Sequence, residues 1–206
     1  MTKINRYSHI LDYSKNEKIL ERIKNYKVNM GFGIHYGWGI EGAIGSPYKI
    51  DASYLSPNVN IAARLEAATR QYGVSILISG ELQEILTDSF KEITRLIDIV
   101  TVKGSAVPMK FYTINLSLNA LEEEKAPFEG LLAKKKKDLR NEAKKELKTS
   151  VQNGIITTSE LLRDESLMKM MDTHKSNQPE FKREYQAAFN KYIGGNWGEA
   201  ILIFRK

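Results

Sequence analysis

Short apolar segments alternate with segments of helical periodicity between residues 28 and 116, and this alternation narrowly limits the folds open to the chain. The segment VNMGFGIHY (28–36) is expected to be a strand. Its two glycines indicate that another stretch of backbone approaches it closely. Residues 39–45 predict a second strand that forms a hairpin with the first. A loop with two prolines is expected over 46–57.

A helix is expected over residues 58–72, because small and apolar residues recur there among strong helix formers. Gly73 is its expected C-terminal stop. Residues 74–78 read as a buried strand, after which Ser79 is expected to cap a helix over 80–86. One or two strands over 90–102 and another over 108–116 complete this unit.

The remainder of the chain is predicted to be helical. Residues 122–148 are highly charged and predict an exposed helix, whose Lys134 cluster is interpreted as a solvated face, with contact to a membrane surface as the alternative. Residues 151–171 predict another helix. Residues 179–206 predict a helical hairpin around Gly194–Asn196 that resembles one unit of a helical repeat and requires a partner or further chain. Its inner faces are expected to carry Phe181, Tyr185, Phe189, Tyr192, Trp197, Ala200 and Phe204.

Four regions follow: a lead-in over 1–27, the strand–helix unit over 28–116, a charged helical linker over 117–150 and a helical region over 151–206. Composition excludes several functions. The chain has no cysteine, so disulfides, thiolate catalysis and cysteine-ligated metal centres are excluded. The net charge of +6 is spread evenly, which disfavours nucleic acid as a partner. No segment approaches the length and apolarity of a membrane span.

Candidate site residues are Asn60 and Arg64, which lie four apart and so project from one face of the predicted helix. A guanidinium there can bind phosphate oxygens, and an amide can hold a sugar hydroxyl. Lys103, at a strand end before a glycine turn, could approach the same phosphate. Each residue alone has a plainer interpretation. Asn60 and Arg64 could lie on a solvated helix face, and Lys103 could belong to a common lysine–glycine turn.

Five ordered segments change that balance: GIHYG (33–37), GAIGS (42–46), VNIAARLE (59–66), YGVSILIS (72–79) and VKGS (102–105). Together they closely resemble the second half of the class III adenylate/guanylate cyclase catalytic domain. The resemblance covers roughly residues 26–116. Residues 51–58 (DASYLSPN) look like the variant found in large protist cyclase-domain proteins, and the pattern over 181–200 resembles the helical segment that follows the domain there.

The resemblance implies an α+β fold, part of a ferredoxin-like domain with an antiparallel sheet, followed by a C-terminal helical extension. It implies that ATP or GTP is converted to a cyclic nucleotide and pyrophosphate at a dimer interface. By position, Asn60 orients the ribose, and Arg64 and Lys103 stabilise charge on the phosphates. Mg²⁺ or Mn²⁺, held by two aspartates, completes such sites.

Three departures from the family pattern bear on function. The metal aspartates of the family precede the equivalent of Val28, and Asp12 lacks the apolar strand and glycine–aromatic loop that surround one. The metals are therefore expected on a partner half, and no metal ligand is assigned here. Ser53 stands where adenylate cyclases often use an aspartate to read the purine, so the base preference stays open. Ser56–Asn58 replaces a glycine–acid pair.

Two functions remain open. The chain is a cyclase-type domain that supplies the Asn60, Arg64 and Lys103 half of a composite site and is inactive alone, or it is a non-catalytic module that scaffolds a larger complex. His35 is interpreted as a structural strand residue rather than a base. The missing strands predict an exposed sheet edge or apolar patch that the helical tail or a partner covers. The expected location is cytoplasmic, or at the cytoplasmic face of a membrane through a larger parent protein or partner.

Overall fold

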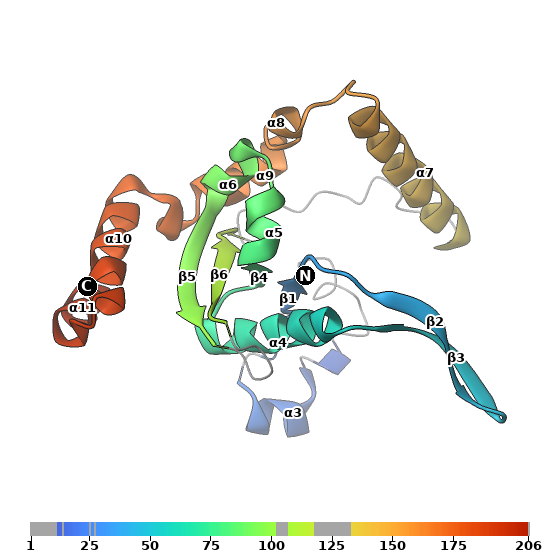
Figure 1. The fold of residues 1–206 in the computed structure, drawn as a ribbon, viewed down its shortest axis with the longest axis horizontal. Helices are drawn as coiled ribbons and strands as arrows, with labels where there is room; N and C mark the ends of the chain where they lie inside the picture. The colour runs from blue at the N-terminus through green and yellow to red at the C-terminus, as the bar shows by residue number, and fades with distance from the viewer. Residues whose placement is uncertain are drawn as a thin grey trace. The chain divides into compact units, whose positions relative to one another are not determined.

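The computed structural model describes residues 12, 13, 15–24, 26, 28–101, 107–117 and 133–205. The chain divides into two compact units, Met1–Ile114 and Asn115–Lys206. The first unit holds the sheets. Its described elements are α3 (Glu17–Arg22), β1 (Phe32–Ile34), β2 (Ile40–Ser46), β3 (Lys49–Leu55), α4 (Pro57–Tyr72), β4 (Ile76–Ser79), α5 (Gly80–Ile85), α6 (Asp88–Ile93), β5 (Thr94–Val100) and β6 (Met109–Ile114) (Figure 1).

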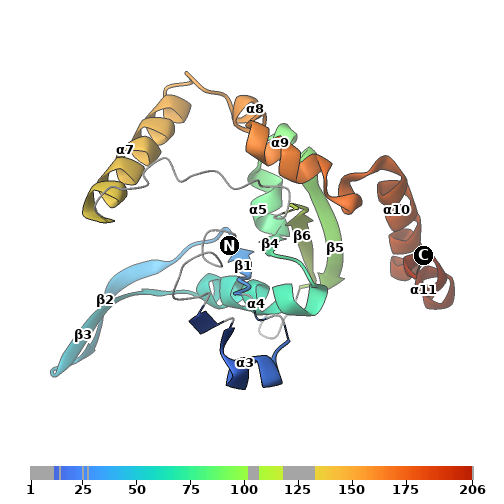
Figure 2. The ribbon, with the colours of Figure 1, turned by 180° about the vertical axis from the view of Figure 1, so that it is seen from behind.

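The main sheet has four strands in the order β1-β4-β6-β5 (Figure 2). The pairs β4–β6 and β5–β6 are antiparallel, whereas β1 runs parallel to β4. The predicted α+β fold is confirmed, but the sheet is mixed rather than wholly antiparallel. Parallel neighbours need a long crossover, and α4 supplies it between β1 and β4.

Helix α4 forms as the sequence predicts, one residue longer at its start. Ser56 is the N-cap, and Pro57 occupies the first helical position, where its missing N–H costs nothing. Gly73 ends the helix in the left-handed conformation, with φ of 64°. Leu65 and Thr69 are its buried residues, so one side of α4 packs into the unit.

The core of the first unit lies between α4 and the sheet. Leu65 packs with Leu77, Met109 and Phe111, all at most 5% exposed. Ser79 begins α5 as predicted, because its side chain accepts a hydrogen bond from the Leu82 amide. The contacts of Leu65 with Leu77, Met109 and Phe111 place β4 and β6 beneath α4.

The glycines of β1 admit the helix backbone, as the sequence predicted. A Cβ on Gly33 would lie 2.3 Å from both the Ala62 carbonyl oxygen and the Glu66 nitrogen. A Cβ on Gly31 would lie 2.1 Å from the Thr69 hydroxyl. Side chains at these positions would push α4 off the strand, so the glycines set the distance between them.

The predicted hairpin between 28–36 and 39–45 is wrong. Strand β2 instead pairs with β3 in an antiparallel ribbon, and the predicted loop over 46–57 contains β3. The prolines that indicated a loop lie outside this ladder, Pro47 in the turn and Pro57 at the start of α4. Within 90–102 the structure likewise places the end of α6 before β5.

The β2–β3 ribbon extends away from the four-stranded sheet (Figures 1 and 2). Nearly every residue of it is exposed. One face carries Ile40, Ile44 and Leu55, which are 62%, 40% and 57% exposed. In the described part of the first unit, β1 is also an edge strand, with Phe32 and Ile34 each 44% exposed. Apolar area is therefore available on the ribbon and at the sheet edge.

The second unit is helical in its described residues. Its elements are α7 (Ala133–Gln152), α8 (Thr158–Leu161), α9 (Glu165–Asp172), the 3₁₀ helix η2 (Lys175–Asn177), α10 (Pro179–Ile193) and α11 (Trp197–Phe204). The helix predicted over 151–171 is two short helices, because Thr157 and Asp164 each cap a new start. Residues 141–149 of α7 are all exposed, in agreement with a solvated helix. No described helix is long and apolar enough to span a membrane.

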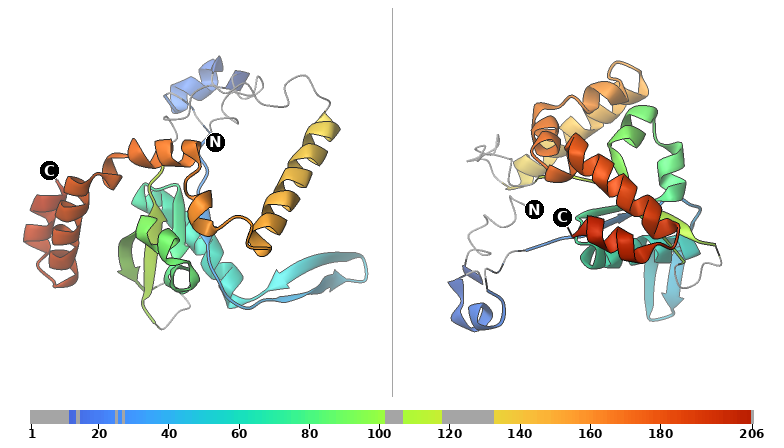
Figure 3. Two further views of the ribbon diagram at one scale, coloured as in Figure 1. Left: turned by 90° about the horizontal axis from the view of Figure 1, so that it is seen from above. Right: turned by 90° about the vertical axis from the view of Figure 1, so that its left-hand side faces the viewer.

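Helices α10 and α11 lie side by side as the predicted hairpin (Figure 3). Tyr185 is the centre of the packing, 5.8 Å from the Phe181 ring, 6.0 Å from Phe189 and 5.7 Å from Phe204. Trp197 was expected on an inner face but is 64% exposed. It is the first residue of α11 and therefore lies next to the Gly194–Asn196 turn, where less of the facing helix covers it.

Candidate active site

The candidate site begins where the ribbon turns into α4. The Ser56 hydroxyl accepts a hydrogen bond from the Asn58 amide at 3.1 Å and donates to the Trp38 carbonyl at 2.6 Å. The Asn58 side-chain nitrogen donates to the same Trp38 oxygen at 2.9 Å. Trp38 lies just before β2 and Ser56 just after β3, so these bonds tie the base of the ribbon to the first turn of the helix.

Asn60 and Arg64 lie in the first two turns of α4, as predicted, on one side of the helix. Asn60 is exposed and Arg64 is half-buried. The N-terminal end of a helix carries partial positive charge, and a guanidinium beside it adds a full charge and several donors. This end of α4 can therefore bind an anion such as a phosphate group.

The other two predicted residues lie elsewhere in the chain. Ser53 is half-buried on β3 and pairs with Gly42 across the ribbon, three residues before the cap of α4. Lys103 is outside the described residues. The structure therefore places Asn60 and Arg64 on one helix and Ser53 on the adjoining strand, and the convergence of Lys103 upon them stays a prediction.

A buried imidazole lies beneath the first turn of α4. The His35 side chain is 4% exposed. Its Nδ1 is 2.8 Å from the Ser79 hydroxyl, and its Nε2 is 3.0 Å from the Asn58 side-chain oxygen. His35 thus links the end of β1 to the end of β4 and to the start of α4, which agrees with a structural role.

Sequence reasoning did not assign Ser56 and Asn58 to this arrangement. A signal was present, because Ser-Pro-Asn is a favourable helix start, with a capping hydroxyl followed by proline. The long-range bonds of Asn58 to His35 and Trp38 left no such local signal.

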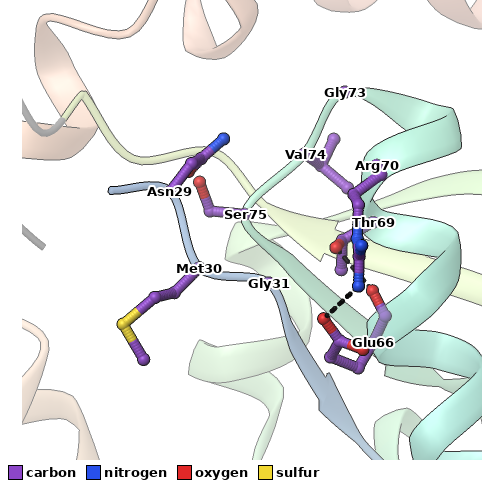
Figure 4. Close-up of a pocket in the computed structure, with 9 residues that line it drawn as sticks. All are labelled: Asn29, Met30, Gly31, Glu66, Thr69, Arg70, Gly73, Val74 and Ser75. Atoms are coloured by element: carbon purple, nitrogen blue, oxygen red, sulfur yellow. Dashed lines mark hydrogen bonds and ion pairs between the residues drawn. The ribbon is translucent and has the colours of Figure 1, made fainter. Parts of the chain in front are cut away.

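A pocket of about 570 Å³ lies at the opposite end of α4 (Figure 4). Its lining includes Glu66, Thr69 and Arg70 of the helix and Met30 and Gly31 before β1. The Arg70 guanidinium points to Glu66, with 3.2 Å between nitrogen and oxygen. None of the predicted site residues lines this pocket, so it is separate from the candidate site.

Comparison with known proteins identifies the domain. Residues 9–116 match the family described as the adenylate and guanylate cyclase catalytic domain, which is more than half of the chain. The chain belongs to this family. The matched region begins at residue 9, whereas the predicted boundary of the domain is at residue 28.

Two proteins with sequences similar to this domain are named adenylate cyclases. An adenylate cyclase of Anabaena cylindrica is 35% identical over 89 residues, covering 43% of this chain and 18% of that protein. The terminal-differentiation specific adenylate cyclase of Dictyostelium discoideum is 34% identical over 88 residues, covering 42% and 4%. The cyclase chain thus spans less than a fifth of the length of these relatives.

Solved structures with similarity to the cyclase domain include a bacterial light-regulated adenylyl cyclase, 32% identical with a TM-score of 0.36, covering 41% of this chain and 23% of that one. Another is the adenylyl cyclase CyaB from P. aeruginosa, 24% identical with a TM-score of 0.35, covering 56% of each chain. Family membership rests on the sequence match.

Class III cyclases use divalent metals, so the cyclase residues must be tested against such a site. Among the described residues, no three histidine, aspartate or glutamate side chains gather where they could hold an ion. Asp12 is the only aspartate before Asp51 in the sequence. No ligand of the family's metal pair is assigned among the described residues, and the binding of phosphate at the start of α4 stays a prediction.

Proposed function

We propose that this cyclase domain acts in the synthesis of a cyclic nucleotide and supplies the ribose- and phosphate-binding half of a site shared between two polypeptides. The main support is the placement of Asn60 and Arg64 on the N-terminal turns of α4 within a chain that belongs to the cyclase family. The substrate is ATP or GTP, and the products are a cyclic nucleotide and pyrophosphate.

Each residue of this half has a defined task. Asn60 hydrogen-bonds the ribose so that its 3′-oxygen is aligned with the α-phosphorus. A bond forms between these two atoms while the bond from the α-phosphorus to the bridging oxygen breaks. Arg64 and Lys103 stabilise the negative charge that grows on the phosphates and on the departing pyrophosphate. Ser53 contacts the purine, where a hydroxyl can donate to or accept from either base.

The partner carries the two metal aspartates, and this chain is inactive without it. The support comes from the sequence, since Asp12 lacks the apolar strand and the glycine–aromatic loop that surround a metal aspartate in the family. The exposed apolar face of the ribbon offers surface for that partner. The parent protein is of the protist type indicated by residues 51–58, and one of its relatives comes from Dictyostelium discoideum.

An assay of cyclic nucleotide formation tests the proposal. The chain alone, with ATP or GTP and Mg²⁺ or Mn²⁺, is expected to form no product, and addition of a cyclase polypeptide with both metal aspartates is expected to give turnover. In the mixture Arg64→Ala should lower kcat by about 100-fold, because the charge it removes acts mainly in the transition state.

Arg70→Ala is the matched control, because Arg70 lies on the same helix but is 77% exposed in its side chain and pairs with Glu66. It should leave kcat within about twofold. Turnover by the chain alone would overturn the shared site. An unchanged rate for Arg64→Ala would make Arg64 structural, and association with the partner without any turnover would favour the scaffold function.

A further inference from the structure

The strongest unassigned feature of the molecule is the hydrogen-bonded chain that runs through His35. Its members come from separate elements: Ser79 ends β4, His35 follows β1, Asn58 lies in the first turn of α4 and Trp38 precedes β2. Each contact is between 2.8 and 3.0 Å. The buried His35 side chain therefore joins β1 to β4 and α4, and Asn58 extends the chain of hydrogen bonds to Trp38.

The contacts fix the direction of the hydrogen bonds of Asn58, and the remaining directions follow for the neutral imidazole. Because the Trp38 carbonyl can only accept, the nitrogen of the Asn58 amide must face it, which turns the Asn58 oxygen toward His35. His35 must then donate from Nε2. Its Nδ1 is left as an acceptor for the Ser79 hydroxyl, whose oxygen accepts in turn from the Leu82 amide at 3.3 Å.

A neutral imidazole with its proton on Nε2 therefore satisfies every member of the chain. Glu81 has a carboxylate oxygen 3.7 Å from Nδ1, and its side chain is half exposed. Loss of the imidazole would leave the Asn58 oxygen without its donor in a partly buried place, and such groups are costly to leave unpaired.

His35 is also the polar member of a row that faces α4. Gly31, Gly33 and Gly37 each lie so close to the helix that a Cβ would meet Thr69, Ala62 and Asn58 at 2.1 to 2.4 Å. The glycines bring the helix near but do not fix where it begins along the strand. A directional bond from His35 to Asn58 does so.

We propose that His35 is a positioning residue of the cyclase site, which holds the first turn of α4 in place by donating its Nε2 proton to Asn58. Asn60 follows two residues later and Arg64 one turn beyond, so their placement depends on this bond. The consequence for turnover rests on the proposed function, whereas the effect on the helix does not.

Hydrogen exchange of the nucleotide-free full chain tests the structural part. In His35→Ala, the backbone amides of residues 60–62 should exchange about tenfold faster than in the parent chain, while those of residues 66–70 keep their relative protection. His35→Gln should restore slow exchange, because its amide nitrogen can take the place of Nε2. Nitrogen NMR at pH 8 should show the Nε2–H tautomer of His35.

Tyr72→Phe is the matched control, because it removes a 2.8 Å hydrogen bond to Asp98 at the other end of the same helix. It should leave the exchange of residues 60–62 unchanged relative to the rest of the unit. If His35→Ala does not fold, Asn58→Ala removes the same bond from the other side and should give the same local acceleration. Uniform acceleration across the unit in both variants would overturn the proposal.

The assembled enzyme provides the second test. His35→Ala should lower kcat about tenfold, and His35→Gln should recover most of that loss. If Arg64→Ala abolishes turnover while His35→Ala leaves it unchanged, the positioning role fails and the proposed function stands. If the exchange results hold but Arg64→Ala has no effect on turnover, the proposed function fails and the structural role of His35 stands.

Discussion

Helix α4 on β1 and the β2–β3 ribbon are neighbours in the sequence but are held in opposite ways. The helix approaches the backbone of its strand closely at Gly33 and buries its own Leu65 in the core. The ribbon is held by its own ladder and exposes apolar side chains such as Ile40. The chain itself thus fixes the position of Asn60 and Arg64, whereas the surface that bears Ser53 is left for another molecule to cover.

The largest expected effect on stability is at the contact between α4 and β1. Gly33→Ala should lower the free energy of unfolding by roughly 3 kcal/mol, because the new methyl group meets helix backbone that cannot move aside alone. Gly42→Ala in the ribbon, where a Cβ meets nothing within 4 Å, should change it by less than about 0.5 kcal/mol. Urea unfolding of both variants measures the difference, and equal losses would refute it.

An intermediate effect is expected when the ribbon is changed. Ile44→Asp should weaken association with the partner cyclase polypeptide about tenfold, since it places a charge on the apolar face formed with Ile40 and Leu55. Sedimentation of the mixture measures it. Ala43→Asp puts the same charge on the opposite face and should weaken association less. Equal weakening by both variants would show that this face is not the contact surface.

The smallest effects come from two matched tyrosines. Tyr72→Phe loses a partly buried hydrogen bond to Asp98 at 2.8 Å and should cost about 1 kcal/mol of unfolding free energy. Tyr54→Phe loses an exposed bond to Glu41 at 3.2 Å in the ribbon and should cost less than about 0.5 kcal/mol. Thermal unfolding of the pair would contradict the comparison if the ribbon variant lost more.

The sequence predicted those parts of the fold that local chemistry determines. Gly73 and the spacing of the apolar residues predict α4, and the glycines at 31 and 33 predict close packing against the strand. The predicted partner of β2 was wrong because Pro47 and Pro57 indicated a loop where β3 lies. Both prolines lie outside the β2–β3 ladder. Parallel pairing of β1 with β4 joins residues more than 40 positions apart, and no local pattern encodes it.

The candidate site likewise combines features that the local sequence predicts with long-range contacts that it does not. Asn60 and Arg64 could be placed together because four residues make one helical turn. The bond from His35 to Asn58 spans 23 positions and depends on how β1 lies under α4. Sequence patterns therefore placed the two candidate side chains on one side of the helix, but not the contacts that hold the helix in place.

The Trp38 carbonyl has a consequence for assembly. It accepts hydrogen bonds from both Ser56 and Asn58, so one oxygen atom links the base of the ribbon to the start of α4. A subunit that docks on the ribbon and tilts it pulls on the same atom that anchors the helix. Under the proposed function, subunit contact and the alignment of Asn60 and Arg64 would then change together, and a partner that binds in the wrong orientation would misalign both residues.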